Sequence, residues 1–343
     1  MQATVAGSPA VRAVTVRRRG ERLDQDLVVV EEPLEIRLDG RPLVVTMRTP
    51  GHDEELAAGF LYGEGTITGG EDIASVRAVA GGAEAGAATA VDGAHAGAGR
   101  ARADRDTPPV GATLAGNDRP AVGGTGGAAE TSRGDGSRPE GILRRIRVAS
   151  FAGDRVEVTL TESAGAEASS DSPAGSPPGD ADPERSFAAT SACGVCGKES
   201  IDDLRADAPA VAPVACAPAL LEALPDRLRS AQALFEATGG IHAAGIFTLD
   251  GDLLCVREDI GRHNAVDKVI GHFVLEGGVP LRNRILVVSG RAGFELVQKA
   301  LAASIPAMVS VGAASSVAVD MATAAGMTLY SFAGRGRGNL HVG

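Results

Sequence analysis

The chain has 343 residues and 44% of them are hydrophobic, so it is long enough for about two domains with substantial cores. Its formal net charge of −11 argues against a nucleic-acid-binding protein, because affinity for nucleic acid comes from neutralising phosphates. The sequence predicts neither a signal peptide nor a membrane span, and it contains only four cysteines, two of them in one short motif. We therefore expect a protein of the reducing cytoplasm with no membrane partner.

The first predicted elements are a β-hairpin and a helix. Residues 34–47 alternate apolar and polar side chains around Asp39-Gly40, a dipeptide typical of a type I′ turn. A helix is expected within residues 49–67, where apolar residues recur at helical spacing and acidic residues crowd the first turn.

Residues 80–141 consist mainly of Ala, Gly, Asp, Arg and Thr without an apolar period, which predicts a disordered insertion. Two strands are expected at residues 142–150 and 155–160, so that residues 1–162 would form a small N-terminal α+β domain. A second low-complexity stretch, residues 163–186, is predicted to be a disordered linker.

The C-terminal part, residues 216–343, has the pattern of an α/β domain. Two helices are expected at residues 218–224 and 225–237, each with proline in its first turn, and Gly239 and Gly240 would end the second. The order then predicted is strand, Asp250-Gly251 turn, strand to residue 257, polar loop, helix 265–275, strand 285–288, helix, strand 307–311, helix and strand 327–332. This alternation favours a mostly parallel sheet.

Three loops should meet where the strands of such a sheet end: residues 289–295, 312–316 and 334–339. Each joins Gly or Ser to a helix N-terminus or to arginine, and such combinations bind phosphate. A single loop of this kind is more often a helix cap, but three at one edge favour a nucleotide-like pocket.

Polar side chains are concentrated between the predicted strand that ends at residue 257 and the predicted helix at residues 265–275. They are Arg257, Glu258, Asp259, Arg262, His263 and Asn264, in the run V-R-E-D-I-G-R-H-N-A-V-D-K-V-I-G. Asn264 is predicted to be a helix N-cap. For the ionisable residues two interpretations stay open: an ion-paired structural network, or a pocket mouth that contacts a heterocycle or ribose.

Two cysteines, Cys193 and Cys196, lie in the segment T-S-A-C-G-V-C-G-K-E-S-I-D at residues 190–202. Lys198 follows the pair, and Ser200 is expected to open a short helix, so both a cation and a helix N-terminus would lower the cysteine pKa. The segment is therefore predicted to be a reactive thiol loop.

Three chemical interpretations of this pair can be compared. Zinc would require a second C-x-x-C pair, but Cys216 has no neighbouring cysteine and Cys255 lies in an apolar run. A thioredoxin-type dithiol requires a βαβ frame that the flanking sequence does not supply. The third interpretation is sulfur carriage, in which one thiolate holds a persulfide and the other displaces it. Spacing alone leaves the last two open.

Four segments together resemble the FdhD family, the formate dehydrogenase accessory sulfurtransferases, over residues 28–79 and 142–342. They are T-P-G-H-D-E-E-L-A-A-G-F-L-Y-G-E-G, T-S-A-C-G-V-C-G-K-E-S-I-D, R-E-D-I-G-R-H-N-A-V-D-K-V-I-G and S-G-R-A-G-F-E-L-V-Q-K-A. The resemblance implies a C-terminal cytidine-deaminase-like domain with a mixed sheet and no zinc site, in a homodimer.

The resemblance also implies a function. Such proteins take persulfide sulfur from a cysteine desulfurase and pass it to the molybdenum or tungsten bis-molybdopterin guanine dinucleotide cofactor needed by formate dehydrogenase. The guanine nucleotide ends of the cofactor would occupy the anion pocket. A cofactor-binding chaperone without sulfur transfer is the alternative.

Carried onto this sequence, the resemblance makes residues 187–215 the sulfur-carrying loop, with Cys193 and Cys196 as the catalytic pair and no metal ligand. The implied cofactor-binding residues are Arg257, Glu258, Asp259, Arg262, His263, Asn264, Ser289, Gly290, Arg291 and Phe332. The insertion at residues 80–141 and the tail, which has His341 where tyrosine is usual, depart from the family pattern. The tail leaves open whether Arg335 or Arg337 faces a phosphate.

Overall fold

The computed structural model describes residues 7–17, 23–80, 154–161 and 209–342, which belong to one compact unit. Several predictions therefore lie outside the described residues. These are the body of the insertion, the strand at residues 142–150, the linker at 163–186 and the cysteine motif at 190–202. None of the helices in the described ranges is both long and apolar enough to span a membrane.

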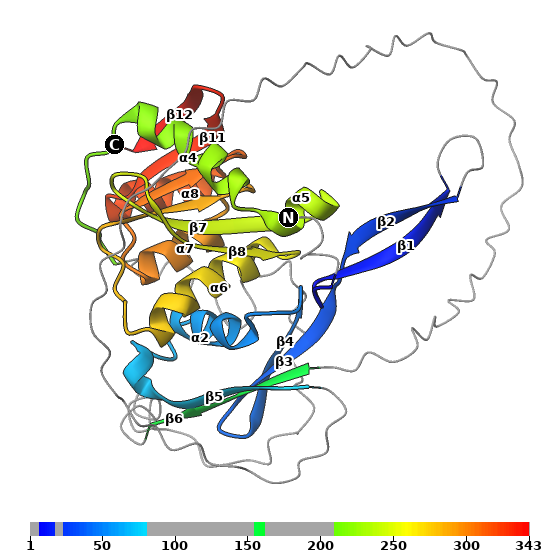
Figure 1. Ribbon diagram of the computed structural model, residues 1–343. Helices are drawn as coiled ribbons and strands as arrows, with labels where there is room; N and C mark the ends of the chain where they lie inside the picture. The colour runs from blue at the N-terminus through cyan, green and yellow to red at the C-terminus, as the bar shows by residue number, and fades with distance from the viewer. Residues whose placement is uncertain (1–6, 18–22, 81–153, 162–208, 343) are drawn as a thin grey trace, which may run out of the picture. The chain divides into compact units, whose positions relative to one another are not determined.

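A four-stranded sheet has the order β4-β3-β6-β5 (Figure 1). Its strands are β3 (Glu32–Leu38), β4 (Arg41–Arg48), β5 (Ile73–Val79), which follows a 3-10 turn η1 (Gly70–Asp72), and β6 (Asp154–Leu160). Asp39 and Gly40 have φ angles of 48° and 76°, so the predicted type I′ hairpin is confirmed. A two-stranded ribbon of β1 (Val11–Arg17) and β2 (Leu23–Val29) precedes the sheet and was not predicted.

The predicted first helix is confirmed as α2 (Asp53–Gly63), which crosses α6 (Arg262–Leu275) at backbone contact. A Cβ atom on Gly59 would lie 1.9 Å from the carbonyl oxygen of Asp267, and one on Gly271 would lie 1.8 Å from that of Glu55. Only glycine fits at these two positions, so the sequence allows the two helices to touch without intervening side chains.

The second sheet has six strands in the order β12-β11-β10-β9-β7-β8 (Figure 1). They are β7 (His242–Thr248), β8 (Leu253–Asp259), β9 (Arg284–Val288), β10 (Ala307–Ser310), β11 (Thr328–Gly334) and β12 (Arg337–Val342). The strands β9, β10 and β11 are parallel, while β7 is antiparallel to both its neighbours and β12 is antiparallel to β11. The implied mixed sheet is confirmed; the sheet is less parallel than the alternation predicted because hairpins form at both edges.

Both faces of this sheet are covered by helices. On β9, Leu286 and Val288 join a core with α2, α6, α7 (Phe294–Ala302) and α8 (Ser316–Ala325). The alternate residues Ile285 and Val287 join a second core with α4 (Pro218–Ser230). Because successive side chains of a strand point to opposite faces, β9 contributes to both cores. The first core also includes residues of β3 and β6, so the two sheets share it.

Two element predictions were wrong. Residues 218–237 form α4 with Pro225 inside it, then α5 (Ala233–Thr238), instead of dividing at Pro225. Packing of Leu221, Leu224 and Leu228 against the sheet stabilises a continuous helix despite the hydrogen bond that proline cannot donate. The expected loop at residues 334–339 instead turns at Arg335-Gly336, both with positive φ, into β12.

Candidate functional site

Two of the three predicted loops, residues 289–295 and 312–316, meet at the edge where β9 and β10 end, and β11 lies beside them. The amide of Val311 donates to the carbonyl of Val288 at 3.1 Å, and that of Gly312 donates to Gly290 at 2.9 Å. The amide of Phe332 in turn donates to Gly312 at 3.0 Å. Main-chain hydrogen bonds therefore join the loops after β9 and β10 side by side, as the sequence predicted, and tie the second of them to β11 in place of the third predicted loop.

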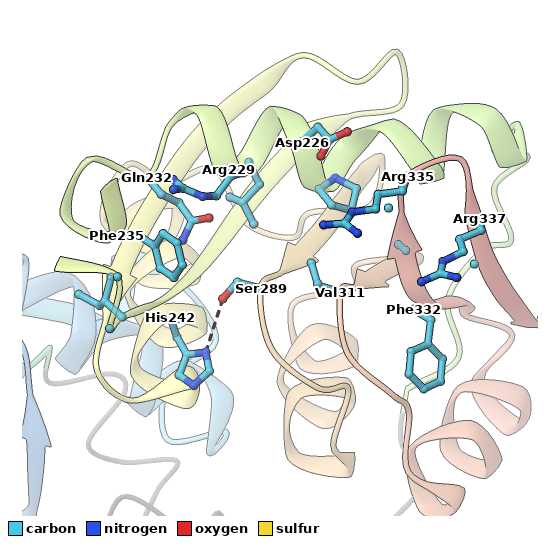
Figure 2. Close-up of a pocket in the computed structure, with 18 of the residues that line it drawn as sticks. Asp226, Arg229, Gln232, Phe235, His242, Ser289, Val311, Phe332, Arg335 and Arg337 are labelled. Atoms are coloured by element: carbon cyan, nitrogen blue, oxygen red, sulfur yellow. Dashed lines mark hydrogen bonds between the residues drawn. The ribbon is translucent and has the colours of Figure 1, made fainter. Parts of the chain in front are cut away.

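A cavity of about 980 Å³ lies at this edge. Figure 2 shows Arg335, Arg337 and Phe332 on one side of it and Gln232, Phe235, His242 and Ser289 on the other. The first group comes from β11, the turn after it and β12, and the second from the α4–α5 connection, α5, β7 and the loop after β9. The volume is at the upper end of the range for small-molecule sites and suits a nucleotide-sized ligand.

Positive charge and aromatic surface are combined on both sides of the cavity. The guanidinium of Arg229 lies 4.3 Å from the centre of the Phe235 ring and is also bound to Glu236 at 2.8 Å. Phe332 is 52% exposed and has a φ of 53°, an unusual conformation for a bulky residue. A solvent-exposed, backbone-strained aromatic residue beside arginines is a ligand contact more often than a core element.

His242 and Ser289 form a hydrogen-bonded pair at the cavity wall. The Ser289 hydroxyl accepts from the Ala243 amide at 2.9 Å and lies 3.5 Å from Nδ1 of His242. Burial lowers the pKa of His242 below its ordinary value, and the nearby Arg262 and His263 lower it further. His242 is therefore neutral at pH 7.

Of the residues predicted to bind cofactor, Ser289 and Phe332 line the cavity. Arg257 instead binds Glu55 through two hydrogen bonds of 2.5 and 2.6 Å, and this contact raises the pKa of Arg257. Asp259 is fully buried and lies 2.7 Å from the ammonium group of Lys268. The ion-paired interpretation thus describes these two residues.

Glu258 also has a structural partner, because its carboxylate accepts two hydrogen bonds of 2.8 Å from the first amides of α5. Asn264 lies inside the first turn of α6, whose N-cap is Gly261, so the N-cap prediction was wrong. Its amide donates instead to the carbonyl of Met47 at 2.8 Å and to Asp259 at 3.0 Å. This long-range contact, which a sequence pattern cannot reveal, replaces the cap.

The remaining predicted residues surround the cavity wall without lining it. Nε2 of His263 lies against the carboxylate of Glu295, and Gly290 approaches the His242 ring closely enough that a Cβ atom would lie 3.5 Å from it. Arg262 acts on His242 through its charge, while Arg291 is exposed and packs against Gly312. Contact between these residues and a cofactor stays a prediction.

Sequence reasoning missed the side of the cavity built by α4, α5 and β7. Arg229, Gln232, Phe235 and His242 belong to no motif, and tertiary packing alone brings them to the sheet edge. The paired Gly239-Gly240, which also lines the cavity, was the nearest sequence signal, but it indicated only the end of a helix.

Two of the four cysteines can be assessed in the structure. Burial raises the pKa of the Cys255 thiol to about 11 and also raises that of Cys216. Both are therefore protonated at neutral pH and poor nucleophiles, and Cys255 is the buried apolar residue that its sequence context predicted. Cys193 and Cys196 lie outside the described residues, so their reactivity stays a prediction.

The chain is thus an α/β protein with a mixed sheet and an arginine-flanked cavity at the ends of its parallel strands. The family model of the FdhD/NarQ family matches residues 29–120 and 148–342. The chain therefore belongs to the FdhD/NarQ family, as the four sequence segments indicated.

Two named relatives have closely similar lengths. The sulfur carrier protein FdhD of Streptomyces coelicolor is 37% identical over 340 residues, covering 97% of this chain and 93% of the relative. The protein of the same name from Mycolicibacterium paratuberculosis is 38% identical over 325 residues, covering 94% and 92%. The crystal structure of a putative formate dehydrogenase accessory protein from Desulfotalea psychrophila has the same fold, with a TM-score of 0.56 at 20% identity and 97% and 96% coverage.

Proposed function

We propose that this protein is a sulfur carrier that serves formate dehydrogenase. It receives persulfide sulfur from a cysteine desulfurase on Cys193 or Cys196 and delivers it to the bis-molybdopterin guanine dinucleotide cofactor of molybdenum or tungsten. The observation that carries the proposal is the C-x-x-C pair in a chain of this family whose two described cysteines have raised thiol pKa values. The printed names of the relatives support the same role.

The chemistry needs two thiols. A thiolate of the pair attacks the outer sulfur of the desulfurase persulfide, forms a new S–S bond and releases the desulfurase thiolate. The second thiolate then attacks the inner sulfur, closes a Cys193–Cys196 disulfide and releases hydrosulfide to the acceptor. The disulfide is reduced to two thiols by a cellular dithiol before the next cycle, so the electrons balance.

The cavity at the sheet edge is proposed to hold a nucleotide end of the cofactor, which is the acceptor substrate. Arg335 and Arg337 can pair with its phosphates, while Phe332 offers a flat surface for a ring. We also propose that the C-terminal part has a cytidine-deaminase-like arrangement without a zinc site, and that the protein is a cytoplasmic homodimer.

The rival from another class is a cofactor-binding chaperone, in which the cavity holds the cofactor and the cysteines transfer no sulfur. The cavity fits both hypotheses, so the thiols must be tested. Intact-protein mass after incubation with a cysteine desulfurase and cysteine should increase by one sulfur, and reductant should remove the addition.

The variants Cys193→Ser and Cys196→Ser identify which thiol is loaded, and the double variant should gain no sulfur. Cys216→Ser is the matched control, because the raised pKa of this half-buried thiol makes it a poor nucleophile. Wild type that gains no mass would leave only the chaperone hypothesis.

A further inference from the structure

Exposed apolar side chains and arginines gather at the mouth of the cavity. Val311 and Phe332, which line it, are 42% and 52% exposed, and Val317 in the first turn of α8 is 54% exposed. Arg335 and Arg337 lie on the same side of the cavity as Phe332 (Figure 2). Among the large apolar side chains exposed in the part of the chain that the structure describes, Phe332 is the single aromatic one.

Main-chain contacts join these groups into one continuous surface around Gly312. The Phe332 amide donates to the Gly312 carbonyl at 3.0 Å. Arg291 packs so closely that a Cβ atom on Gly312 would lie 3.0 Å from the Arg291 nitrogen. The start of α8 is held to the same loop, because the amide of its N-cap, Ser315, donates to Ala292 at 3.0 Å. We call this region the mouth surface, and its members are Arg291, Val311, Val317, Phe332, Arg335 and Arg337.

The mouth surface is positively charged in a chain whose net charge is −11. The three segments that build it, residues 289–295, 311–317 and 332–339, contain three arginines and one acidic residue, Glu295. The three arginines are exposed, whereas the Glu295 carboxylate lies against Nε2 of His263 on α6. The mouth surface therefore attracts acidic groups.

Apolar side chains beside exposed arginines are typical of a protein interface. Arginine and aromatic residues are enriched at interfaces, and exposed apolar groups rimmed by polar ones mark contact sites. A symmetric contact between two copies of this chain would place the mouth surface against itself, and its like charges would oppose that pairing. The charge thus favours a different protein, whose matching surface has an apolar centre and an acidic rim.

We propose that the mouth surface is the docking site of the protein that receives the cofactor, which covers it with an apolar contact rimmed by acidic side chains. A ligand in the cavity leaves through its mouth, so a protein docked on the surrounding residues is placed to receive it. This inference rests on the proposed function, because it takes the cavity as the site of the cofactor and formate dehydrogenase apoprotein as the recipient.

The test measures binding of formate dehydrogenase apoprotein to the full chain by biolayer interferometry. Arg291→Glu and Val317→Glu are the test variants, because neither side chain lines the cavity. Each should weaken binding at least about tenfold, since the first reverses a charge that faces acidic groups and the second places a charge against an apolar contact. Wild-type binding should also weaken as the salt concentration rises, because salt screens the exposed arginines.

Two matched controls carry the same kinds of substitution away from the mouth surface. Arg282→Glu changes an exposed arginine that precedes β9, whereas Arg291 follows the other end of that strand. Leu254→Glu changes an apolar residue of β8 that is 43% exposed. Both controls should bind the apoprotein like wild type. Thermal melts show whether each variant folds, and sedimentation shows whether it keeps the oligomeric state of wild type.

Unchanged apoprotein binding by either test variant, or equal weakening by the controls, would overturn the inference. Conversion of a wild-type dimer to a monomer by Arg291→Glu or Val317→Glu would also overturn it, because a second copy would then occupy the mouth surface. Sulfur loading of Cys193 and Cys196 is followed separately by mass. Wild type that loads sulfur without binding the apoprotein refutes the docking site alone, and wild type that binds without loading refutes the sulfur-carrier proposal alone.

Discussion

Replacing Gly271 by alanine should strongly destabilise the fold, because α2 and α6 touch at this residue. The added Cβ would lie 1.8 Å from the carbonyl oxygen of Glu55 and 2.7 Å from the amide nitrogen of Gly59. A close carbon–oxygen contact is about 3.3 Å, so the helices would have to separate by about 1.5 Å. Both obstructing atoms belong to the backbone and cannot rotate away.

The separation would strain contacts that hold α6 to the segment before α2, including the 2.8 Å hydrogen bond from Lys268 to the carbonyl of Thr49. Overpacking of this kind costs about 1–3 kcal/mol, and we expect the upper end because the backbone must move. A loss of about 3 kcal/mol corresponds to a melting temperature lower by roughly 6–12 °C in a unit of this size.

Circular dichroism melts and urea titrations would measure the effect. Gly293→Ala is the matched control, since its φ is −85° and a Cβ there meets no atom within 4 Å; it should stay within about 0.5 kcal/mol of wild type. A Gly271→Ala protein as stable as the control would refute the backbone contact between the two helices.

Three further predictions concern charge, the cavity and the insertion. Burial raises the pKa of Glu55, but hydrogen bonds from Arg257 and His52 outweigh burial and lower this pKa from 4.5 to about 2. The ionised carboxylate therefore stabilises the fold fully above pH 4.5, and this stabilisation is lost as the pH falls toward 2. Urea titrations across this range should show up to about 3 kcal/mol of this loss in wild type and less in Glu55→Gln; equal pH dependence would contradict the ion pair. Arg337→Ala should weaken guanosine diphosphate binding by about 1.5–3 kcal/mol in calorimetry, and an unchanged affinity would move the phosphate site elsewhere. Deleting residues 83–139 should leave the melting temperature and sulfur loading nearly unchanged, because a sequence without an apolar period buries little surface; a large drop in melting temperature would reveal a folded element.

Local patterns predicted those parts of the fold whose cause is local. Asp39-Gly40 specifies its hairpin because both residues accept positive φ, and the apolar runs of β9 and β10 predicted buried parallel strands. The break predicted at Pro225 was wrong because a buried helix face outweighs the usual cost of an internal proline. The hairpin of β11 and β12 was missed because glycine and arginine alternate through its turn at residues 334–338 and β12 is mostly exposed.

Some features of the candidate site could likewise be predicted from local sequence patterns, and others could not. The loops that follow β9 and β10 could be predicted, because parallel strands deliver their carboxyl ends to one edge. The roles of Arg257 and Asp259 could not, because their partners Glu55 and Lys268 are identified only by the fold, and Glu55 is 202 residues away in sequence. Gln232 carries no sequence signal at all, since only the fold brings it to the cavity wall.

The sulfur-carrier role is tested most directly by following a radioactive sulfur label from cysteine to the cofactor of formate dehydrogenase. Purified protein is loaded by a cysteine desulfurase, separated from it, and incubated with the cofactor and the dehydrogenase apoprotein. The proposal predicts that label appears in the cofactor with wild type and the Cys216→Ser control, and not with the double variant of Cys193 and Cys196. Equal labelling by the double variant, or dehydrogenase activation by it without label, would contradict sulfur carriage and favour the chaperone.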